Sequence, residues 1–268
     1  MKSKRSEYFQ TPHGLVHRSC IHLIDSDQKI DTQNTGLSGC KRSATIHTLR
    51  ALSPNAWKAS ANFAPAVPLG SMTVTFTVPE PPTVDGALIY LFPAAEDAYL
   101  TTILQPVLQW GVDGDGEGGD CWTIASWHVT TDGHTLKSPS IEVTPGDTIV
   151  GTVKATQCSD EGCDWLIETR DVSCEPNLVT ALQIGNMPSL LLFLVAGALE
   201  AYPEDPCCLL RRGQFPASGS TTFSDIQLID LAGNPFTARW NAQFAESDIT
   251  GRFGVEVGQD NRAVTLFY

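Results

Sequence analysis

The stretch that decides the fold is SMTVTFTVPEPP, Ser71 to Pro82. Apolar and polar residues alternate along it until prolines end it, which is typical of a half-buried β-strand. A more apolar strand, ALIYLFP, follows, and short strand patterns continue as far as AVTLFY near the C-terminus. Turn clusters such as TPGD and LAGNP separate these strands, with no helical pattern between them. The succession predicts an all-β protein built as a two-sheet antiparallel β-sandwich or jelly roll.

The first part of the chain has a different character. We expect residues 1–52 to form a basic N-terminal extension and residues 53–268 to form the sandwich domain. Residues 1–50 hold eight Lys and Arg against four Asp and Glu, a net charge of +4, while the rest of the chain carries −17. Opposite charges attract, so the extension can lie on the acidic body as a removable segment. The alternative is that Leu15–Ile24 adds a permanent strand to the sandwich.

Composition limits the partners and the location of the protein. The net charge of −13 and the pI of about 4.7 argue against nucleic acid or an anionic membrane surface as a partner. The apolar run Leu190–Leu199 is too short to span a bilayer and is predicted to be a buried strand. Eight cysteines favour disulfides and weakly favour secretion, although the N-terminus shows no apolar signal segment. We expect a monomer.

Neither a metal nor an organic cofactor is predicted. The group His13, His17, Cys20 and His22 is crowded on a weakly patterned segment. The acidic stretch GVDGDGEGGD resembles a calcium loop, but its twelfth position is Ile124, where an EF-hand needs a bidentate glutamate. The sequence also contains no P-loop, dinucleotide-binding fingerprint, nucleophile elbow or HExxH motif.

Two glutamines stand in the otherwise apolar strand TTILQPVLQWG, Thr101 to Gly111. Side chains alternate across a strand, so Gln105 and Gln109 share one face with Ile103 and Val107. A buried amide without a partner costs on the order of 1–3 kcal/mol, so these two amides need partners. Either they bond neighbouring backbone and water, or they line a cleft.

The strand CWTIASWHV divides its aromatic residues between two faces. Trp122 and His128 share one face, and Trp127 lies on the other. We expect one tryptophan to lie in the core and the other to line a groove that suits peptide side chains or sugar rings. Gln109, Trp122, Trp127 and His128 are therefore the candidate ligand-binding residues.

The order of these motifs resembles that of the eqolisins, or glutamic peptidases. The strand TVTFTVPEPP precedes an apolar strand, an I-L-Q strand and a W-x4-W strand, and I-x-V-x-P-G-D-x-I, V-x-A-T and DWLIETRDV follow. The similarity covers roughly Trp57–Val172. It implies a concanavalin A-like sandwich and acid peptidase activity. In that family an I-L-Q-T-G segment supplies a catalytic glutamine, and a later x-L-E-N strand supplies a catalytic glutamate.

Carried over by motif order, the resemblance implies Gln105 and Glu168 as the catalytic pair. The glutamate would take a proton from water and return it to the leaving amine, while the glutamine amide would bond the oxyanion. Both side chains should then lie on neighbouring strands in one cleft. Eqolisins are typically made with a basic inhibitory pro-segment, which implies that residues up to the dibasic Lys41-Arg42 step cover the cleft.

Two other functions stay open on the same fold. A concave sheet that carries Gln, Trp, His and Glu also describes a non-catalytic, lectin-like glycan-binding protein or an interaction protein. A glycosidase would need a second carboxylate beside Glu168, either from the loop at Asp113–Asp120 or from Glu142. The predicted ligand is therefore a peptide or a glycan.

Overall fold

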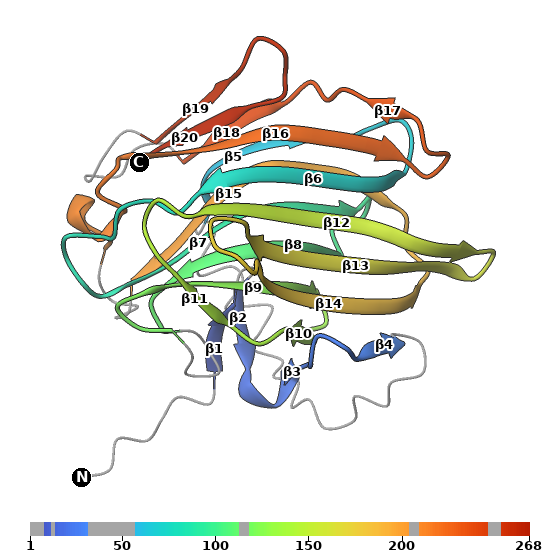
Figure 1. The fold of residues 1–268 in the computed structure, drawn as a ribbon, viewed down its shortest axis with the longest axis horizontal. Helices are drawn as coiled ribbons and strands as arrows, with labels where there is room; N and C mark the ends of the chain where they lie inside the picture. Colours follow the sequence, from blue (N-terminus) through green and yellow to red (C-terminus); the bar gives the residue numbers. More distant parts are fainter. Residues whose placement is uncertain (1–7, 12–13, 32–56, 113–117, 204–208, 246–252) are drawn as a thin grey trace.

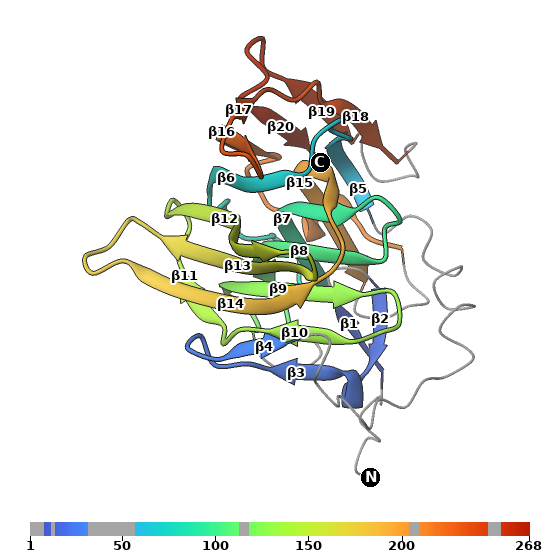
Figure 2. The same ribbon diagram turned by 90° about the vertical axis from the view of Figure 1, so that its right-hand side faces the viewer.

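The computed structural model describes residues 8–11, 14–31, 57–112, 118–203, 209–245 and 253–268. Within these ranges the chain forms β-strands and two short 3-10 turns, η1 (Arg18–Cys20) and η2 (Arg212–Gln214), and no α-helix. No helix in the described part of the chain is both long and apolar enough to cross a membrane. Two nine-stranded sheets stack face to face, which confirms the predicted all-β sandwich (Figures 1 and 2).

The first sheet, called sheet I, forms the layer that carries both glutamines. Its strands in spatial order are β18 (Asn241–Phe244), β5 (Trp57–Phe63), β15 (Leu191–Pro203), β7 (Ala87–Asp97), β8 (Thr102–Trp110), β9 (Trp122–Thr130), β10 (Thr135–Lys137) and β3 (Ile21–Leu23), with β11 (Ile141–Val143) also paired to β9. The apolar run at Leu190–Leu199 lies almost entirely in β15, so its prediction as a strand is confirmed.

The second sheet, called sheet II, forms the opposite layer. Its strands in spatial order are β19 (Gly254–Val257), β20 (Val264–Phe267), β16 (Ser220–Asp230), β6 (Leu69–Thr77), β12 (Thr148–Ser159), β13 (Gly162–Asp171), β14 (Leu178–Met187) and β4 (Lys29–Asp31), with β17 (Pro235–Phe236) also paired to β16. A separate hairpin, β1 (Tyr8–Thr11) and β2 (Gly14–His17), precedes η1.

The N-terminal part of the chain contributes a strand to each sheet. The stretch predicted as one strand at Leu15–Ile24 is divided into β2, η1 and β3. Strand β3 pairs in parallel with β10 of sheet I, and β4 pairs in parallel with β14 of sheet II. The other strand pairs are antiparallel across the residues that the structure describes. The dibasic step at Lys41-Arg42 and the acidic loop at 113–117 lie outside the described residues.

The core lies between the sheets, and strand alternation builds it. In β6, Met72, Val74 and Phe76 are buried, while Thr73 and Thr75 between them are partly exposed. Strands β7 and β8 differ, because every one of their residues is buried. Their outward-facing residues form a second apolar cluster, so sheet I is covered on both of its faces. Burial on both faces explains why ALIYLFP is apolar throughout instead of alternating.

Disulfides are present, as the cysteine count suggested. Cys158 and Cys163 are joined across the β12–β13 hairpin, and Cys20 is also disulfide-bonded. Cys121 and Cys174 are free thiols that are partly exposed. Three further cysteines lie outside the described residues, namely Cys40, Cys207 and Cys208.

We predict that Gly197→Ala destabilises the sandwich. A Cβ atom built at Gly197 would lie 2.3 Å from the ring of Phe223, which sits in the core between the sheets. Overpacking of this kind costs typically about 1–3 kcal/mol of the free energy of unfolding, measurable by urea denaturation. Gly254→Ala is the matched control, because its nearest contact would lie at 3.6 Å. Equal stability of the two variants would contradict the predicted clash.

Candidate functional site

The outer face of sheet I, which points away from sheet II, gathers the polar side chains of interest. Strand alternation and register place on this face Glu96, Gln105, Gln109, Thr123, Lys137 and Glu200, together with the aromatic residues Tyr90, Phe92, Trp127 and Tyr202. All ten are buried. Ionisable groups are rarely buried without a structural or chemical reason, so this face is the first candidate for a site.

Both glutamines of β8 lie on this face. Gln105 and Gln109 point to the same side as Ile103 and Val107, as their spacing predicted. Gln105 pairs across the sheet with Trp127, and Gln109 pairs with Thr123 on one side and Tyr90 on the other. The two amides therefore lie on the outer face of sheet I, in two different rows of residues paired across neighbouring strands.

The structure does not bring Gln105 and Glu168 together. Glu168 lies in β13 of sheet II, between Thr152 of β12 and Ala181 of β14. Its neighbours Ile167 and Thr169 point into the core, so Glu168 points outward, where its carboxylate pairs with Arg170. The predicted position of Glu168 on a strand next to Gln105 is therefore wrong, because the two strands belong to different sheets.

The remaining predicted ligand-binding residues are divided between the faces of sheet I. Trp127 lies on the outer face, where its ring packs edge-on against Tyr90 and Lys137 Nζ stands 5.1 Å from the ring centroid. Trp122 belongs to the core between the sheets, which confirms that one tryptophan is a core residue. His128 has the same parity as Trp122 and also points inward.

The structure adds a glutamate that the sequence analysis overlooked. Glu200 of β15 pairs with Tyr90 of β7, and Tyr90 pairs with Gln109 of β8. Trp57 of β5 extends the same row on the other side of Glu200. Neighbouring strands lie about 4.8 Å apart, so the Cα atoms of Glu200 and Gln109 are roughly 10 Å apart. Side chains of this length can approach a common substrate from the two sides.

The carboxyl group of Glu200 is fully buried and is hydrogen-bonded by neighbouring aromatic side chains. The Tyr202 hydroxyl donates a hydrogen bond to Glu200 Oε1, and the Trp57 side chain is a second hydrogen-bonding partner. The other oxygen, Oε2, has no hydrogen-bond partner among the residues described. Burial raises the pKa of Glu200 to about 8, while the bonds from Tyr202 and Trp57 oppose this shift and the nearby charge of Glu96 adds to it.

The amide of Gln109 is hydrogen-bonded through its nitrogen, while its oxygen is buried without a partner among the described residues. Its Nε2 donates to the carbonyl of Gly111 at 2.9 Å. Gly118 leaves room for the amide, since a Cβ built there would lie 3.1 Å from Nε2 and 2.4 Å from the Gly111 oxygen. Gly118 also has a φ of 91°, a conformation that favours glycine.

Two sequence signals could have identified this row. Glu200 interrupts the apolar strand LLLFLVAGALEAY, and a single carboxylate in such a run marks a buried ionisable group. The segment VLQWG also fits the glutamine motif, as does the I-L-Q segment four residues earlier. The sequence does not specify the register of β15, β7 and β8, and it is this register that places Glu200 and Gln109 in one row.

Comparison with known structures agrees with this topology. A scytalido-glutamic peptidase bound to a peptide-based transition-state analog superimposes with a TM-score of 0.54 at 16% identity, over 80% of this chain and 98% of that one. SCP-B, a member of the eqolisin family in complex with a tripeptide, gives a TM-score of 0.51 at 16% identity over the same shares of the two chains. The chain has the eqolisin fold. At this identity the likeness shows the fold alone.

The other comparisons found no relative. No protein-family model matches the sequence, and no curated protein matches it. The resemblance to the eqolisins is therefore confirmed as a remote structural match, and the functional residues have to be argued from this chain's own geometry. Among the residues that the structure describes, no cluster of three or more His, Cys, Asp or Glu side chains could hold a metal ion.

We predict that Glu200 makes folding stability depend on pH. A carboxyl whose pKa rises from 4.5 to about 8 on folding contributes stability that is fully present below pH 4.5 and is lost as pH rises to about 8. The difference in unfolding free energy between wild type and Glu200→Gln should change by about 1.4 kcal/mol per pH unit in this window. Urea denaturation at a series of pH values measures it.

The matched control is Glu168→Gln, which removes a carboxylate from the partly exposed outer face of sheet II. A slope of the same size for both variants would show that the effect does not come from the buried Glu200. A flat difference for Glu200→Gln between pH 4.5 and 8 would show that this carboxyl titrates normally in the folded protein.

Proposed function

We propose that the protein is a peptidase-like hydrolase whose outer face of sheet I binds a peptide, with Glu200 and Gln109 as the reacting pair. One observation carries the proposal. A buried carboxyl group and a buried amide occupy one cross-strand row, and each keeps an oxygen without a hydrogen-bond partner among the described residues. Such atoms cost on the order of 1–3 kcal/mol each when left unsatisfied, which is a reason to look for a substrate between them.

The family motifs support the same pair. The eqolisin glutamine segment ends in L-Q-T-G, and Leu108–Gly111 reads L-Q-W-G. The family's glutamate lies in an x-L-E strand, and Ala198–Glu200 reads A-L-E, whereas Glu168 follows isoleucine. We therefore assign the carboxyl role to Glu200, and the amide role to Gln109 instead of Gln105. Gln105 then forms part of the wall of the site beside Trp127.

The proposed chemistry uses one proton carrier and one neutral donor. As a carboxylate, Glu200 takes a proton from water as the water oxygen bonds to the peptide carbonyl carbon. It then returns that proton to the amide nitrogen as the carbon–nitrogen bond breaks. Gln109 Nε2 carries two hydrogens and uses one for Gly111, so the second can bond the oxyanion.

Burial decides which form of Glu200 exists before substrate enters. With a pKa of about 8 the covered carboxyl is protonated in acid, and it must ionise to act as a base. Contact with water and with the amide of Gln109 favours the ionised form, because both stabilise its charge. Activity then requires that this face opens to solvent or substrate.

The walls of the site are aromatic. Trp57 and Phe92 pack edge-on with centroids 5.7 Å apart, and Tyr90 and Trp127 do so at 6.2 Å. Aromatic walls of this kind suit the apolar side chains of a peptide, and they also suit sugar rings.

Glu96 favours a second candidate, a glycosidase. It is buried on the same face, and its charge acts on Glu200, so two carboxyl groups share the site. Glycosidases place two carboxyl groups roughly 5–10 Å apart across the scissile bond. Glu96→Gln should abolish glycan hydrolysis under that candidate and leave peptide hydrolysis largely intact under the first.

We predict that Glu200→Gln lowers the rate of peptide hydrolysis at acid pH by about 10²–10⁴-fold, the contribution of general acid–base catalysis. Gln109→Ala should lower kcat by about 10²–10³-fold, the usual effect of losing one oxyanion donor. The measurement is cleavage of an acid-denatured protein substrate. Gln105→Ala is the matched control within β8, and Glu168→Gln is the control on sheet II. Both should reduce the rate far less.

Results of three kinds would count against the assignment. Glu168→Gln and Gln105→Ala could be inactive while Glu200→Gln and Gln109→Ala remain active, which would restore the pair expected from motif order. A wild type that hydrolyses glycans and no peptide would favour the glycosidase. A wild type that cleaves nothing but binds glycans through Trp127 would favour the lectin-like alternative.

We predict that Tyr202→Phe shifts the pH profile of the reaction. The Tyr202 hydroxyl bonds Glu200 and lowers its pKa, so its loss should raise the apparent pKa of the carboxyl and move the ascending limb of kcat/KM to higher pH. Tyr268→Phe is the control, since it removes a partly buried tyrosine hydroxyl far from Glu200 in the sequence, one bonded to Thr221 at 2.8 Å. An identical pH profile for Tyr202→Phe and wild type would remove Tyr202 from the mechanism.

A further inference from the structure

Strand β3 joins the N-terminal part of the chain to the edge of sheet I. It pairs in parallel with β10 over three residues, and the amide of Ile24, just beyond it, donates to the Lys137 carbonyl at 2.8 Å. Strand β3 ends the strand order of sheet I, so within the described part of the chain it is paired on one side. An edge strand held by so few hydrogen bonds can open locally while the rest of the sandwich stays folded.

Two histidine rings meet where β3 joins the sheet. His22 of β3 stands beside Leu136 of β10 and points the same way, toward the space between the sheets. Its ring is stacked with that of His134, in the β9–β10 hairpin, and the ring centroids are 6.4 Å apart. His22 Nε2 and His134 Nδ1 are both buried, and neither has a hydrogen-bond partner among the described residues. An imidazolium carries hydrogen on both nitrogens and needs two acceptors, so this arrangement suits the neutral form of both rings.

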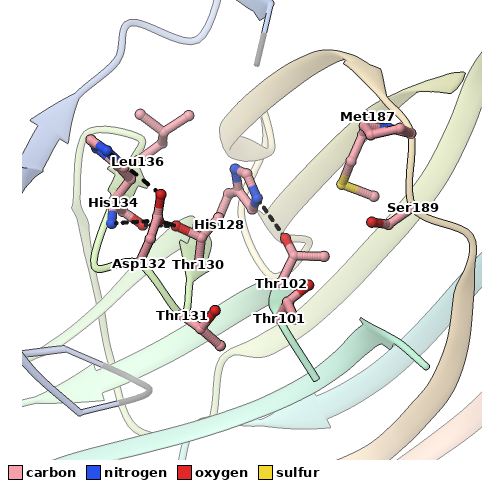
Figure 3. Close-up of a pocket in the computed structure, with 11 residues that line it drawn as sticks. Thr101, Thr102, His128, Thr130, Thr131, Asp132, His134, Leu136, Met187 and Ser189 are labelled. Carbon is pink, nitrogen blue, oxygen red and sulfur yellow. Dashed lines mark hydrogen bonds and ion pairs between the residues drawn. The ribbon is translucent and has the colours of Figure 1, made fainter. Parts of the chain in front are cut away.

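A carboxylate lies beside the ring pair. His134 Nε2 is 3.8 Å from Asp132 Oδ2, so Asp132 balances the charge of one imidazolium, not of two. Figure 3 shows Asp132, His134 and His128 together at the cavity on this end of the sandwich. Burial lowers the pKa of His128 to about 4, so this third ring is neutral above that pH. In mild acid, therefore, two imidazoliums would share the carboxylate of Asp132.

The segments around β3 carry further charged or titratable groups. Among the described residues they are His17, Arg18, Asp25, Asp27 and Lys137. The His17 ring is hydrogen-bonded to Ser19, and the next three side chains are exposed, so solvent screens their charges. Lys137 pairs with Leu23, which points to the opposite side of the strand from His22. Burial lowers the pKa of His22, and the charge of His134 lowers it further.

We propose that β3 is an acid-sensitive joint: acidification charges His22 and His134, and their repulsion separates β3 from β10 while β4 keeps the N-terminal segment on sheet II. Opening moves the two imidazoliums apart and brings both into contact with water, which stabilises their charges. The joint does not depend on the proposed hydrolytic function, because neither histidine belongs to the outer face of sheet I.

The direction of the pH dependence follows from proton uptake. The contribution of a neutral His22 to the closed form is fully present above pH 6.5, the ordinary pKa of histidine, and is lost as pH falls through its lowered pKa. Uptake of one proton on opening changes the opening equilibrium by about tenfold per pH unit. Opening of β3 should therefore become easier below pH 6.5.

The experiment is amide hydrogen exchange of the full chain, followed by NMR between pH 7 and pH 4.5 and corrected for intrinsic exchange rates. Protection of the β3 amides and of Ile24 should fall by about tenfold or more across this range. Strand β4 is the internal control, because it is also a parallel edge strand and holds no histidine. Its protection should change far less. Equal losses in β3 and β4 would indicate general unfolding and overturn the proposal.

Variants identify the groups that titrate. His22→Gln and His134→Gln cannot be charged, so each should make the protection of β3 almost independent of pH, and either one serves if the other does not fold. His17→Gln is the matched control on the same segment and should keep the wild-type pH dependence. Protection of β3 that does not change with pH in wild type, or that still falls about tenfold in His22→Gln, would also overturn the proposal.

Discussion

Burial of sheet I on both faces is the constraint on which the candidate site depends. Sheet II faces water on its outer side, as the half-exposed Thr73, Thr75 and Glu168 show, but the outer face of sheet I is covered. Burial on that face removes the carboxyl group of Glu200 from water and raises its pKa to about 8. Glu200 is therefore protonated below about pH 8, whereas the side chain of Glu168, on sheet II, is partly exposed and ion-paired with Arg170. The two glutamates differ because the outer face of sheet I is covered, whereas the outer face of sheet II is in contact with water.

The sequence predicted much of the fold for reasons that are local. Alternation in β6, proline-terminated strands and turn clusters are short-range features, so the sandwich and the shared face of Gln105 and Gln109 followed from them. The division of Trp122 and Trp127 between core and outer face followed from the same parity.

The partner of the glutamines could not be predicted in this way. Alternation gives the face of a residue within its own strand, but it does not say which sheet the strand joins or which residue stands beside it. Glu168 stands where the order of the eqolisin motifs places the glutamate, yet its strand, β13, belongs to sheet II and the glutamines belong to sheet I. Glu200 was overlooked since β15 is apolar on both faces, as a strand covered on both sides must be. The proposed pair depends on the order β15–β7–β8, a long-range property.

The two buried ionisable groups, one on each face of sheet I, act on stability with opposite signs. Glu200 contributes stability that is lost as pH rises from 4.5 to about 8, whereas His128 contributes stability that is lost as pH falls from 6.5 to about 4. Between pH 4.5 and 6.5 the two slopes, each about 1.4 kcal/mol per pH unit, cancel. Above this range only Glu200 titrates, and below it only His128 does. Their sum therefore has its broad maximum in mild acid, because in this range the folded protein keeps the carboxyl of Glu200 protonated and the ring of His128 neutral, the forms that burial favours.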